Sequence, residues 1–314
     1  MTQPKIGLAL GGGGARGFAH IGVLQVLQEA GIRLDYLAGT SMGAVVGAMY
    51  AESLDAFQVE DRWKEFLESE TYQSVGIPQL VTQDDKETGF WDQVASGLKK
   101  RYAMNVARNQ VALIKSERLR RAVEHLITIP DFSQCRLPLT VVATDLISGE
   151  DLPITSGDLH QAVTASSSIP GFLPPITYDG RLLSDGGVSC PIPIRYARGS
   201  KSTRVIGVGV PPPAIFPSPP ENALEIFNRA EQITSRCYSR MQMQEADVAI
   251  FPELENVHWY EFGRMQEIIQ AGRHGTEALL PVIDRMLFGS LPVWQKTWIA
   301  LTGADVRRYY RGKM

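Results

Sequence analysis

Short apolar runs alternate with longer amphipathic stretches over the first fifty residues. The runs 5–10 and 32–38 predict β-strands, and residues 18–30 between them predict a helix. The apolar residues that fall near one face of this helix are Phe18, Ile21, Leu24 and Leu27. A second helix is expected directly after Ser41. Because apolar strands that alternate with amphipathic helices are typical of a mostly parallel sheet with helices on both faces, we expect an α/β fold.

The alternation continues in the later part of the chain. Strand-like runs occupy 137–146, 204–210 and 247–251, and helical patterns occupy 158–166, 223–246 and 262–287. A short apolar run at 181–183 lies among turns, and a proline-rich loop occupies 211–220. Since no run of about 18 or more apolar residues occurs, the pattern predicts no membrane-spanning helix.

Residues 54–126 interrupt this pattern with mixed helices and polar loops, which predicts a helical, cap-like insertion. Its basic stretch, at 99–121, interleaves Lys and Arg with apolar residues. Such a stretch is usually a solvated helix face, but the same pattern also occurs in helices that rest on anionic lipid headgroups. The tail, 291–314, combines aromatic and basic side chains, which suits a membrane interface or a docking or dimer-contact helix. Peripheral membrane contact and a homo-oligomer are therefore both expectations.

Composition excludes several classes of protein. Of the 314 residues, 44% are hydrophobic, which is ordinary for a globular chain and argues against disorder. The net charge of −3 offers no bulk attraction for nucleic acid, and no motif for binding it is visible. The three cysteines, Cys135, Cys190 and Cys237, lack C-x-x-C spacing, which favours free thiols over disulfides or a zinc site. Without a signal-peptide pattern at the start, a cytoplasmic protein is expected.

Consecutive glycines, Gly11–Gly14, follow the first predicted strand and open the first helix together with Gly17. Gly12, Gly14 and Gly17 satisfy the G-x-G-x-x-G pattern of dinucleotide-binding folds, and Asp35 lies about the right distance downstream for the acid that holds a ribose. Asp35, however, begins the second strand, whereas that acid belongs at the strand's far end. A glycine loop has a second use, because its N–H groups at a helix N-terminus can face a developing oxyanion.

Ser41 lies at the centre of Gly39-Thr40-Ser41-Met42-Gly43, a G-x-S-x-G sequence between the second predicted strand and the second helix. In a nucleophile elbow the central residue is strained and exposed, and the residues two before and two after it must be very small. Gly39 and Gly43 meet that demand. Because the carboxyl ends of parallel strands share one edge of a sheet, a nucleophile beside an oxyanion hole accounts for both the glycine loop and Ser41. Dinucleotide binding accounts only for the loop.

A serine hydroxyl needs a general base, and the residues leave its identity open. The chain order Ser41, Asp185 and then His258 or His274 would fit a Ser-Asp-His triad. Both histidines lie where a surface or packing role is the usual interpretation. Asp185 begins the sequence Asp185-Gly186-Gly187, which is either an ordinary turn or a turn that presents the base.

Taken in order, segments of this chain resemble the four signatures of the patatin-like phospholipase family, and bacterial single-domain members are the best comparison. The segments are Gly11–Gly17, Gly39–Gly43, Ala165-Ser166-Ser167-Ser168-Ile169-Pro170 and Asp185–Gly187. The resemblance covers about residues 5–210 and is specific, since the motifs recur in order at plausible spacing. It implies a three-layer α/β/α hydrolase domain over residues 1–290, with the tail of unassigned role.

The resemblance further implies a serine lipid acyl hydrolase of the phospholipase A or lysophospholipase type, whose partner is a lipid or acyl-ester substrate and which needs no cofactor or metal. Carried over to this chain, Ser41 is the nucleophile and Asp185 the base, without a histidine. The N–H groups of Gly12, Gly13 and Gly14 form the oxyanion hole. Supporting roles fall to Arg16, Gly39, Gly43, Ser168, Pro170, Gly186 and Gly187. The alternative from another class is a regulatory or scaffold protein that keeps the fold and acts through the insertion or the tail.

Overall fold

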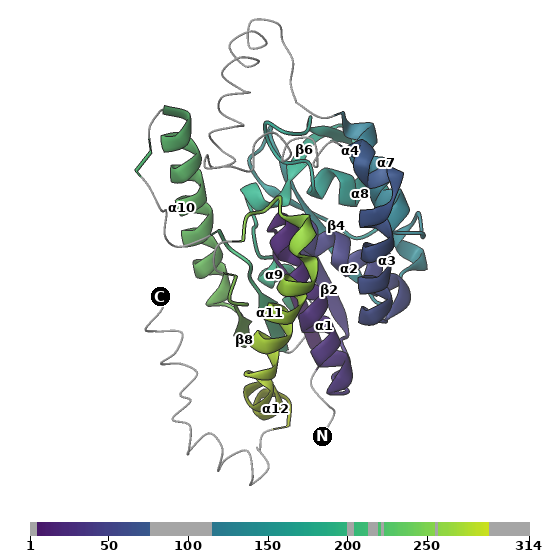
Figure 1. The fold of residues 1–314 in the computed structure, drawn as a ribbon, viewed down its shortest axis with the longest axis vertical. Helices are drawn as coiled ribbons and strands as arrows, with labels where there is room; N and C mark the ends of the chain where they lie inside the picture. The colour runs from purple at the N-terminus through teal and green to yellow at the C-terminus, as the bar shows by residue number, and fades with distance from the viewer. Residues whose placement is uncertain are drawn as a thin grey trace, which may run out of the picture.

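The computed structural model describes residues 5–75, 115–199, 204–212, 219–220, 223–254 and 257–288. In this part of the chain an eight-stranded sheet is covered by helices on both faces (Figure 1). The strands are β1 (Ile6–Leu10), β2 (Tyr36–Thr40), β3 (Leu139–Asp145), β4 (Asp151–Ile154), β5 (Ile176–Tyr178), β6 (Arg181–Asp185), β7 (Arg204–Val208) and β8 (Val248–Ile250). The helices are α1 (Ala19–Glu29), α2 (Met42–Ser53), α3 (Ala56–Glu68), α4 (Glu70–Val75), α7 (Ser116–Leu126), α8 (Leu159–Ser166), α9 (Ile194–Arg198), α10 (Ala223–Met243), α11 (Met265–Glu277) and α12 (Leu280–Phe288).

The sheet has the order β5-β6-β3-β2-β1-β7-β8, and β4 also pairs with β3. The strands from β3 through β2, β1 and β7 to β8 run parallel, as the alternating pattern predicts. The other edge is antiparallel, because β4 and β6 both pair antiparallel with β3, and β5 with β6. The sequence pattern gave no sign of β4 or β5, since runs of four and three residues are too short to show a period.

Several predicted helix boundaries shift in the structure. The helix predicted over 18–30 is a 3₁₀ turn, η1 (Gly14–Phe18), followed by α1. The helix predicted over 262–287 divides into a short 3₁₀ turn, η5 (Phe262–Arg264), then α11 and α12. Pro281 lies in the first turn of α12, where its missing N–H costs no helical bond, and it could not continue α11.

The two faces of the sheet bury cores of different size. In β1, Leu8 and Leu10 point into the larger core, which α1, α2, α8 and α11 help to fill. Ala9, between them, belongs to the smaller core on the other face, beneath α9 and the end of α10. This alternation within one strand follows from the twofold period of β-structure. The three-layer α/β/α arrangement predicted from the sequence is confirmed.

The described part of the predicted insertion, α3, α4 and α7, packs onto the larger core. Trp63 of α3 meets Phe18 edge to face, with ring centroids 4.9 Å apart, and a second aromatic contact joins Phe18 to Phe262 at 5.6 Å. Most of the basic stretch predicted at 99–121 and the whole tail, 291–314, lie outside the described residues. Figure 1 shows α10 at one side of the fold and α3 and α7 at the opposite side.

Candidate active site

Ser41 stands at the sharp turn between β2 and α2, with φ 53° and ψ −124°. Residues other than glycine rarely adopt this conformation, which costs on the order of 1–3 kcal/mol. A Cβ at Gly39 would run into the Gly43 carbonyl, and a Cβ at Gly43 would run into the Leu10 carbonyl. The packing of this turn therefore requires both glycines, as the G-x-S-x-G pattern predicts.

The Ser41 hydroxyl donates a hydrogen bond to Asp185 Oδ2, at 2.7 Å, although 144 positions separate the two residues. The register of the sheet explains the contact. Thr40 pairs with Val142 of β3, and Asp185 pairs with Ala143, the next residue of β3. β3 therefore lies between the serine and the carboxylate and holds them at the same level. Both side chains are 7% exposed.

The Asp185 carboxylate is anchored on several sides. The carboxylate Oδ1 accepts the Gly187 N–H at 2.7 Å. The backbone carbonyl of Asp185 accepts the Thr144 hydroxyl at 2.9 Å. Burial raises the pKa of Asp185 to about 6, although the hydrogen bonds from Ser41 and Gly187 oppose that rise. The charge of Glu231 on α10 raises the pKa further. The carboxyl group can therefore hold or release a proton close to neutral pH.

Ser166, at the end of α8, fixes the backbone of the elbow. Its hydroxyl accepts the Ser41 N–H at 2.9 Å and donates to the Val142 carbonyl at 2.6 Å. The sequence motif included Ser166 without a role, and it assigned Ser168 and Pro170 to support of the Asp185 loop. The Ser168 carbonyl accepts the Asp185 N–H at 2.9 Å, whereas Pro170 is exposed. The run of serines at the end of α8 indicated a supporting role in the site. Only the fold identifies which of the hydroxyls contacts the nucleophile residue.

The glycine loop lies directly against the nucleophile. A Cβ at Gly12 would sit 3.3 Å from the Ser41 Cβ. The Gly12 N–H is directed away, since it donates to the Pro191 carbonyl at 3.0 Å. A Cβ at Gly13 would press on the Val210 side chain, and Gly14, with φ 56°, faces the Trp259 carbonyl. Larger residues at these glycines would displace the loop from the serine.

Two buried polar side chains flank this loop. His20 is fully buried, and its Nε2–H donates to the Gly11 carbonyl at 2.7 Å. Burial lowers the pKa of His20 to about 4, so the imidazole is neutral at physiological pH. Burial also lowers the pKa of Arg16 to about 10, and among the described residues its Nε has no hydrogen-bond partner. Through its hydrogen bond to Gly11, His20 supports the glycine loop locally.

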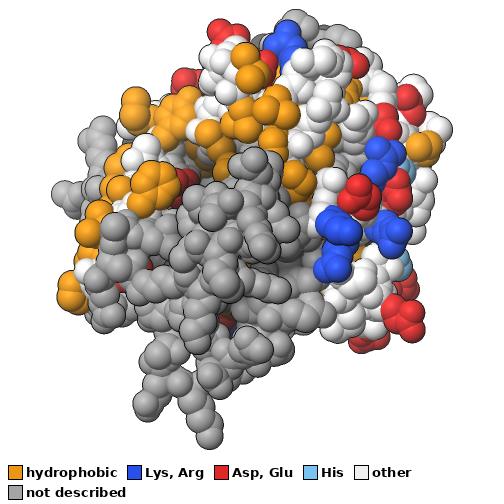
Figure 2. All heavy atoms as spheres, turned by 90° about the horizontal axis from the view of Figure 1, so that it is seen from above, with side chains coloured by type: hydrophobic (Ala, Val, Ile, Leu, Met, Phe, Trp, Pro, Cys, Tyr) orange, Lys and Arg blue, Asp and Glu red, His pale blue; other side chains and the backbone are white. Residues whose placement is uncertain are grey.

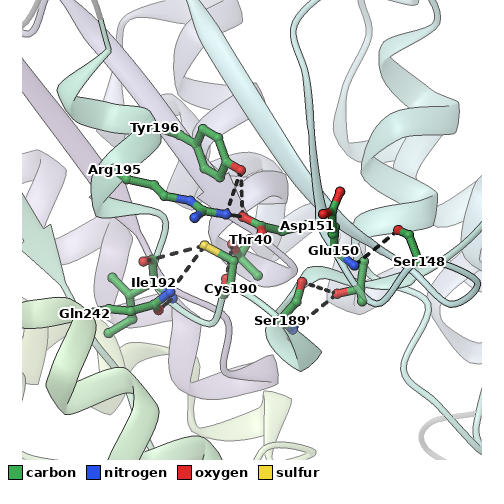
Figure 3. Close-up of polar contacts among 11 residues, drawn as sticks. Thr40, Ser148, Glu150, Asp151, Ser189, Cys190, Ile192, Arg195, Tyr196 and Gln242 are labelled. Atoms are coloured by element: carbon green, nitrogen blue, oxygen red, sulfur yellow. Dashed lines mark hydrogen bonds and ion pairs between the residues drawn. The ribbon is translucent and has the colours of Figure 1, made fainter.

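The segment 190–192 contacts the elbow, the turn after Asp185 and the glycine loop. Figure 3 shows Cys190 and Ile192 of this segment beside Thr40 and Gln242. The Cys190 carbonyl accepts the Thr40 hydroxyl at 2.9 Å, and the Cys190 N–H donates to the Gly186 carbonyl at 2.8 Å. The Pro191 carbonyl accepts the N–H of Gly12 in the glycine loop. Gln242 of α10 holds the segment in place, because its Oε1 accepts the Ile192 N–H at 2.8 Å. Sequence reasoning missed this connection, since no local pattern marks Gln242.

The alternatives left open by the sequence can be compared with this geometry. Asp35 lies at the start of β2, where its carboxylate accepts the Ile6 N–H at 2.8 Å, at the opposite end of the strands from the glycine loop. All five histidines lie within the described residues, and none hydrogen-bonds to Ser41 or Asp185. His258 is exposed and stacks on Tyr260, with ring centroids 5.2 Å apart.

Residues 8–198 match the family model described as patatin-like phospholipase. The chain belongs to the patatin-like phospholipase family. The four motifs of the resemblance all fall within the matched residues. The described residues hold no group of three or more His, Cys, Asp or Glu side chains arranged for a metal ion.

Two relatives of this patatin-like chain are longer proteins. An uncharacterized NTE family protein of Mycobacterium tuberculosis is 32% identical over 241 residues, which are 76% of this chain and 58% of that protein. Lysophospholipase NTE1 of Pyricularia oryzae is 27% identical, over 93% of this chain and 19% of its own length. The chain thus spans little more than half of the first relative. The structure is similar to the crystal structure of VipD from Legionella pneumophila, with 16% sequence identity and a TM-score of 0.42. The match covers 88% of this chain and 66% of the VipD chain.

None of the helices in the described ranges is both long and apolar enough to cross a membrane.

Proposed function

We propose that this patatin-like chain hydrolyses acyl esters of lipids, with Ser41 as the nucleophile and Asp185 as its general base. The observation that carries the proposal is the hydrogen bond of 2.7 Å from the Ser41 hydroxyl to Asp185 Oδ2. The strained backbone of Ser41 and the raised pKa of Asp185 both support it, because each is typical of a group prepared for reaction.

In the first half of the reaction, Asp185 takes the hydroxyl proton while Ser41 Oγ attacks the ester carbonyl carbon. The tetrahedral intermediate then collapses, the alcohol leaves with the proton from Asp185, and an acyl-serine remains. In the second half, Asp185 takes a proton from water, and the hydroxide attacks the acyl group. The fatty acid leaves, and the proton returns to Ser41. A carboxyl pKa of about 6 suits both directions of proton transfer near neutral pH.

The oxyanion of each intermediate is assigned to the glycine loop. The sequence resemblance nominated Gly12, Gly13 and Gly14, but the Gly12 N–H donates to Pro191 and is therefore not free in this structure. Gly13 and Gly14 remain the donors of the proposal. Arg16, buried in the turn that follows, adds positive charge behind them. A water-excluded site strengthens such interactions because the local dielectric constant is low.

The lipid substrate class rests on the family and on one relative, whose name is lysophospholipase. Purified protein should release fatty acid from a lysophospholipid and from a short-chain ester. Ser41→Ala and Asp185→Asn should each lower turnover by at least about 10³-fold, whereas His258→Ala and His274→Ala should stay within about twofold. Comparing the lipids that accumulate with wild type and with Ser41→Ala would identify the substrate.

Loss of turnover in a folded His258→Ala or His274→Ala protein would replace the proposed Ser-Asp pair by a triad. Full turnover by a folded Ser41→Ala protein would contradict hydrolysis through this site altogether.

A further inference from the structure

The outward face of α10 carries an apolar stripe, with the exposed Glu231 at one border. Residues of an α-helix follow one another by about 100°, so the large exposed side chains of α10 fall within an arc of about 140°. They are Ile226, Phe227, Ile233, Tyr238 and Met241. Phe227 is 70% exposed and Met241 64%. An amphipathic helix normally turns its apolar stripe toward the core, so this orientation calls for a partner outside the described fold.

The opposite face of α10 attaches the helix to the protein. Ser239 and Met243 are buried, and Met243 belongs to the smaller core of the sheet. Gln242 bonds to the Ile192 N–H, so this end of the helix is tied to the segment that connects the catalytic loops. With respect to the described residues, the apolar stripe is therefore the uncovered side of a helix whose other side is packed against the protein.

The stripe has few polar groups that need a hydrogen-bond partner from outside. Thr234 lies within it, and its hydroxyl donates to the Ala230 carbonyl at 2.9 Å inside the helix. The phenol of Tyr238 is exposed, and tyrosine suits a boundary between apolar and aqueous phases. A fluid apolar phase would satisfy this surface without matching hydrogen bonds.

Positive charge borders one edge of the stripe. Arg229, Arg236 and Arg240 are spaced so that they fall within an arc of about 40°, next to Ile233 and Ile226. An apolar stripe with arginines along its edge is the pattern of helices that lie in the plane of a lipid interface. The arginines can reach anionic headgroups while the stripe enters the acyl region.

The stripe also lies beside the proposed catalytic site. Glu231, which is exposed and borders the stripe beside Tyr238, is close enough for its charge to act on Asp185. Val188, three residues after Asp185, is 53% exposed, and Ile147, in the turn after β3, is 80% exposed. Thr144 ties these two segments together, because its hydroxyl contacts both the Asp185 carbonyl and the Ser189 hydroxyl. Figure 2 shows hydrophobic side chains gathered on the side of the molecule where α10 lies.

We propose that the outward face of α10 docks onto a lipid surface, with its apolar stripe in the acyl region and its arginines against anionic headgroups. The proposal rests on the proposed function, since docking here would bring the site containing Ser41 and Asp185 to its substrate.

Vesicle co-sedimentation tests the apolar stripe, using the Ser41→Ala protein so that hydrolysis does not disturb the lipid. Phe227→Ser should weaken binding to vesicles of phosphatidylcholine and phosphatidylglycerol at least tenfold. The matched control is Phe57→Ser on α3, which removes an exposed phenylalanine on the other side of the fold and should leave binding unchanged. Unchanged melting temperatures of both variants would establish that they are folded.

The arginine edge has its own test. Arg236→Gln should weaken binding to the anionic vesicles about fivefold and leave binding to pure phosphatidylcholine unchanged, because each basic residue near an anionic surface contributes on the order of 1 kcal/mol. Raising the salt concentration should remove the difference between the two vesicle types.

Equal vesicle binding by the Phe227→Ser, Phe57→Ser and parent proteins would overturn the proposal. Conversion of a dimer to a monomer by Phe227→Ser, with vesicle binding unchanged, would overturn it and assign the stripe to a second copy of the chain. Stripe-dependent binding by Ser41→Ala, combined with no esterase activity of the wild type, would leave the docking surface in place and contradict only the proposed function.

Discussion

Two helices of this chain, α2 and α10, both carry large apolar residues but place them in opposite surroundings. In α2 every residue from Met42 to Ala51 is buried, on all sides of the helix. In α10 five large apolar residues face outward, and among the described residues only the reverse face, which includes Met243, is covered. α2 begins at the nucleophile, so its rigid packing fixes Ser41. α10 reaches the same site through Gln242 while keeping its apolar side free. The buried helix α2 thus positions the nucleophile, and the exposed face of α10 is available for the proposed contact with lipid.

Outside the proposed Ser41–Asp185 pair, the largest effect on turnover is expected at the loop that faces the start of α2. In Gly13→Val, the new side chain would meet Val210 and displace the proposed oxyanion donors, so turnover of a short-chain ester should fall by about 10²- to 10³-fold. Gly263→Ala is the matched control, since a Cβ there would meet nothing within 4 Å. Near-normal turnover of a folded Gly13→Val protein would remove the glycine loop from the mechanism.

The buried Asp185 carboxylate should make activity and stability depend on pH in opposite directions. Asp185 has a pKa of about 6 in the folded protein against 3.8 as its ordinary value. Because only the ionised form accepts the Ser41 proton, kcat/KM should fall about tenfold per pH unit below about pH 6.

Stability should change in the opposite sense. The folded protein binds this proton more tightly than the unfolded chain, so stability falls as pH rises from about 4 to 6, by up to about 3 kcal/mol. Asp185→Asn should therefore unfold at higher denaturant concentration than the parent at pH 8, although it is inactive. A variant less stable than the parent at pH 8 would contradict the raised pKa.

Matched substitutions in the two helices test their different surroundings directly. Val46→Ser in α2 leaves a cavity and buries a hydroxyl, so the free energy of unfolding should fall by about 2–4 kcal/mol. Ile233→Ser in α10, at a residue that is 48% exposed, should change it by less than about 0.5 kcal/mol. Urea unfolding of both variants gives the comparison. A large loss for Ile233→Ser would mean that the outward face of α10 is covered within the folded chain.

The smallest effect on turnover is expected at the support of the elbow. Ser166→Ala removes the acceptor of the Ser41 N–H, so kcat should fall about tenfold while KM changes little. Ser166→Thr keeps the hydroxyl and should restore part of the loss. An equal loss in both variants would point to packing at this position, because the hydroxyl would then make no difference.

The order of strands and helices and the positions of the critical glycines could be predicted from the sequence, because both depend on near neighbours along the chain. The requirement for Gly39 and Gly43 follows from the turn itself. The strands that escaped prediction, β4 and β5, are short and sit at the antiparallel edge, where their pairing with β3 and β6 stabilises them rather than any pattern of their own.

By itself, the sequence determined an α/β chain with a nucleophile elbow, a glycine loop at the neighbouring strand end and a candidate acid. Only the tertiary structure decided which groups meet. The pairing of β6 with β3 brings Asp185 to Ser41. The Pro191 carbonyl accepts the Gly12 N–H, and the Ser166 hydroxyl accepts the Ser41 N–H. It also decided that the apolar side of α10 faces outward. A helical period fixes which residues share a face, but the packing of the whole chain decides whether that face meets the core or the solvent.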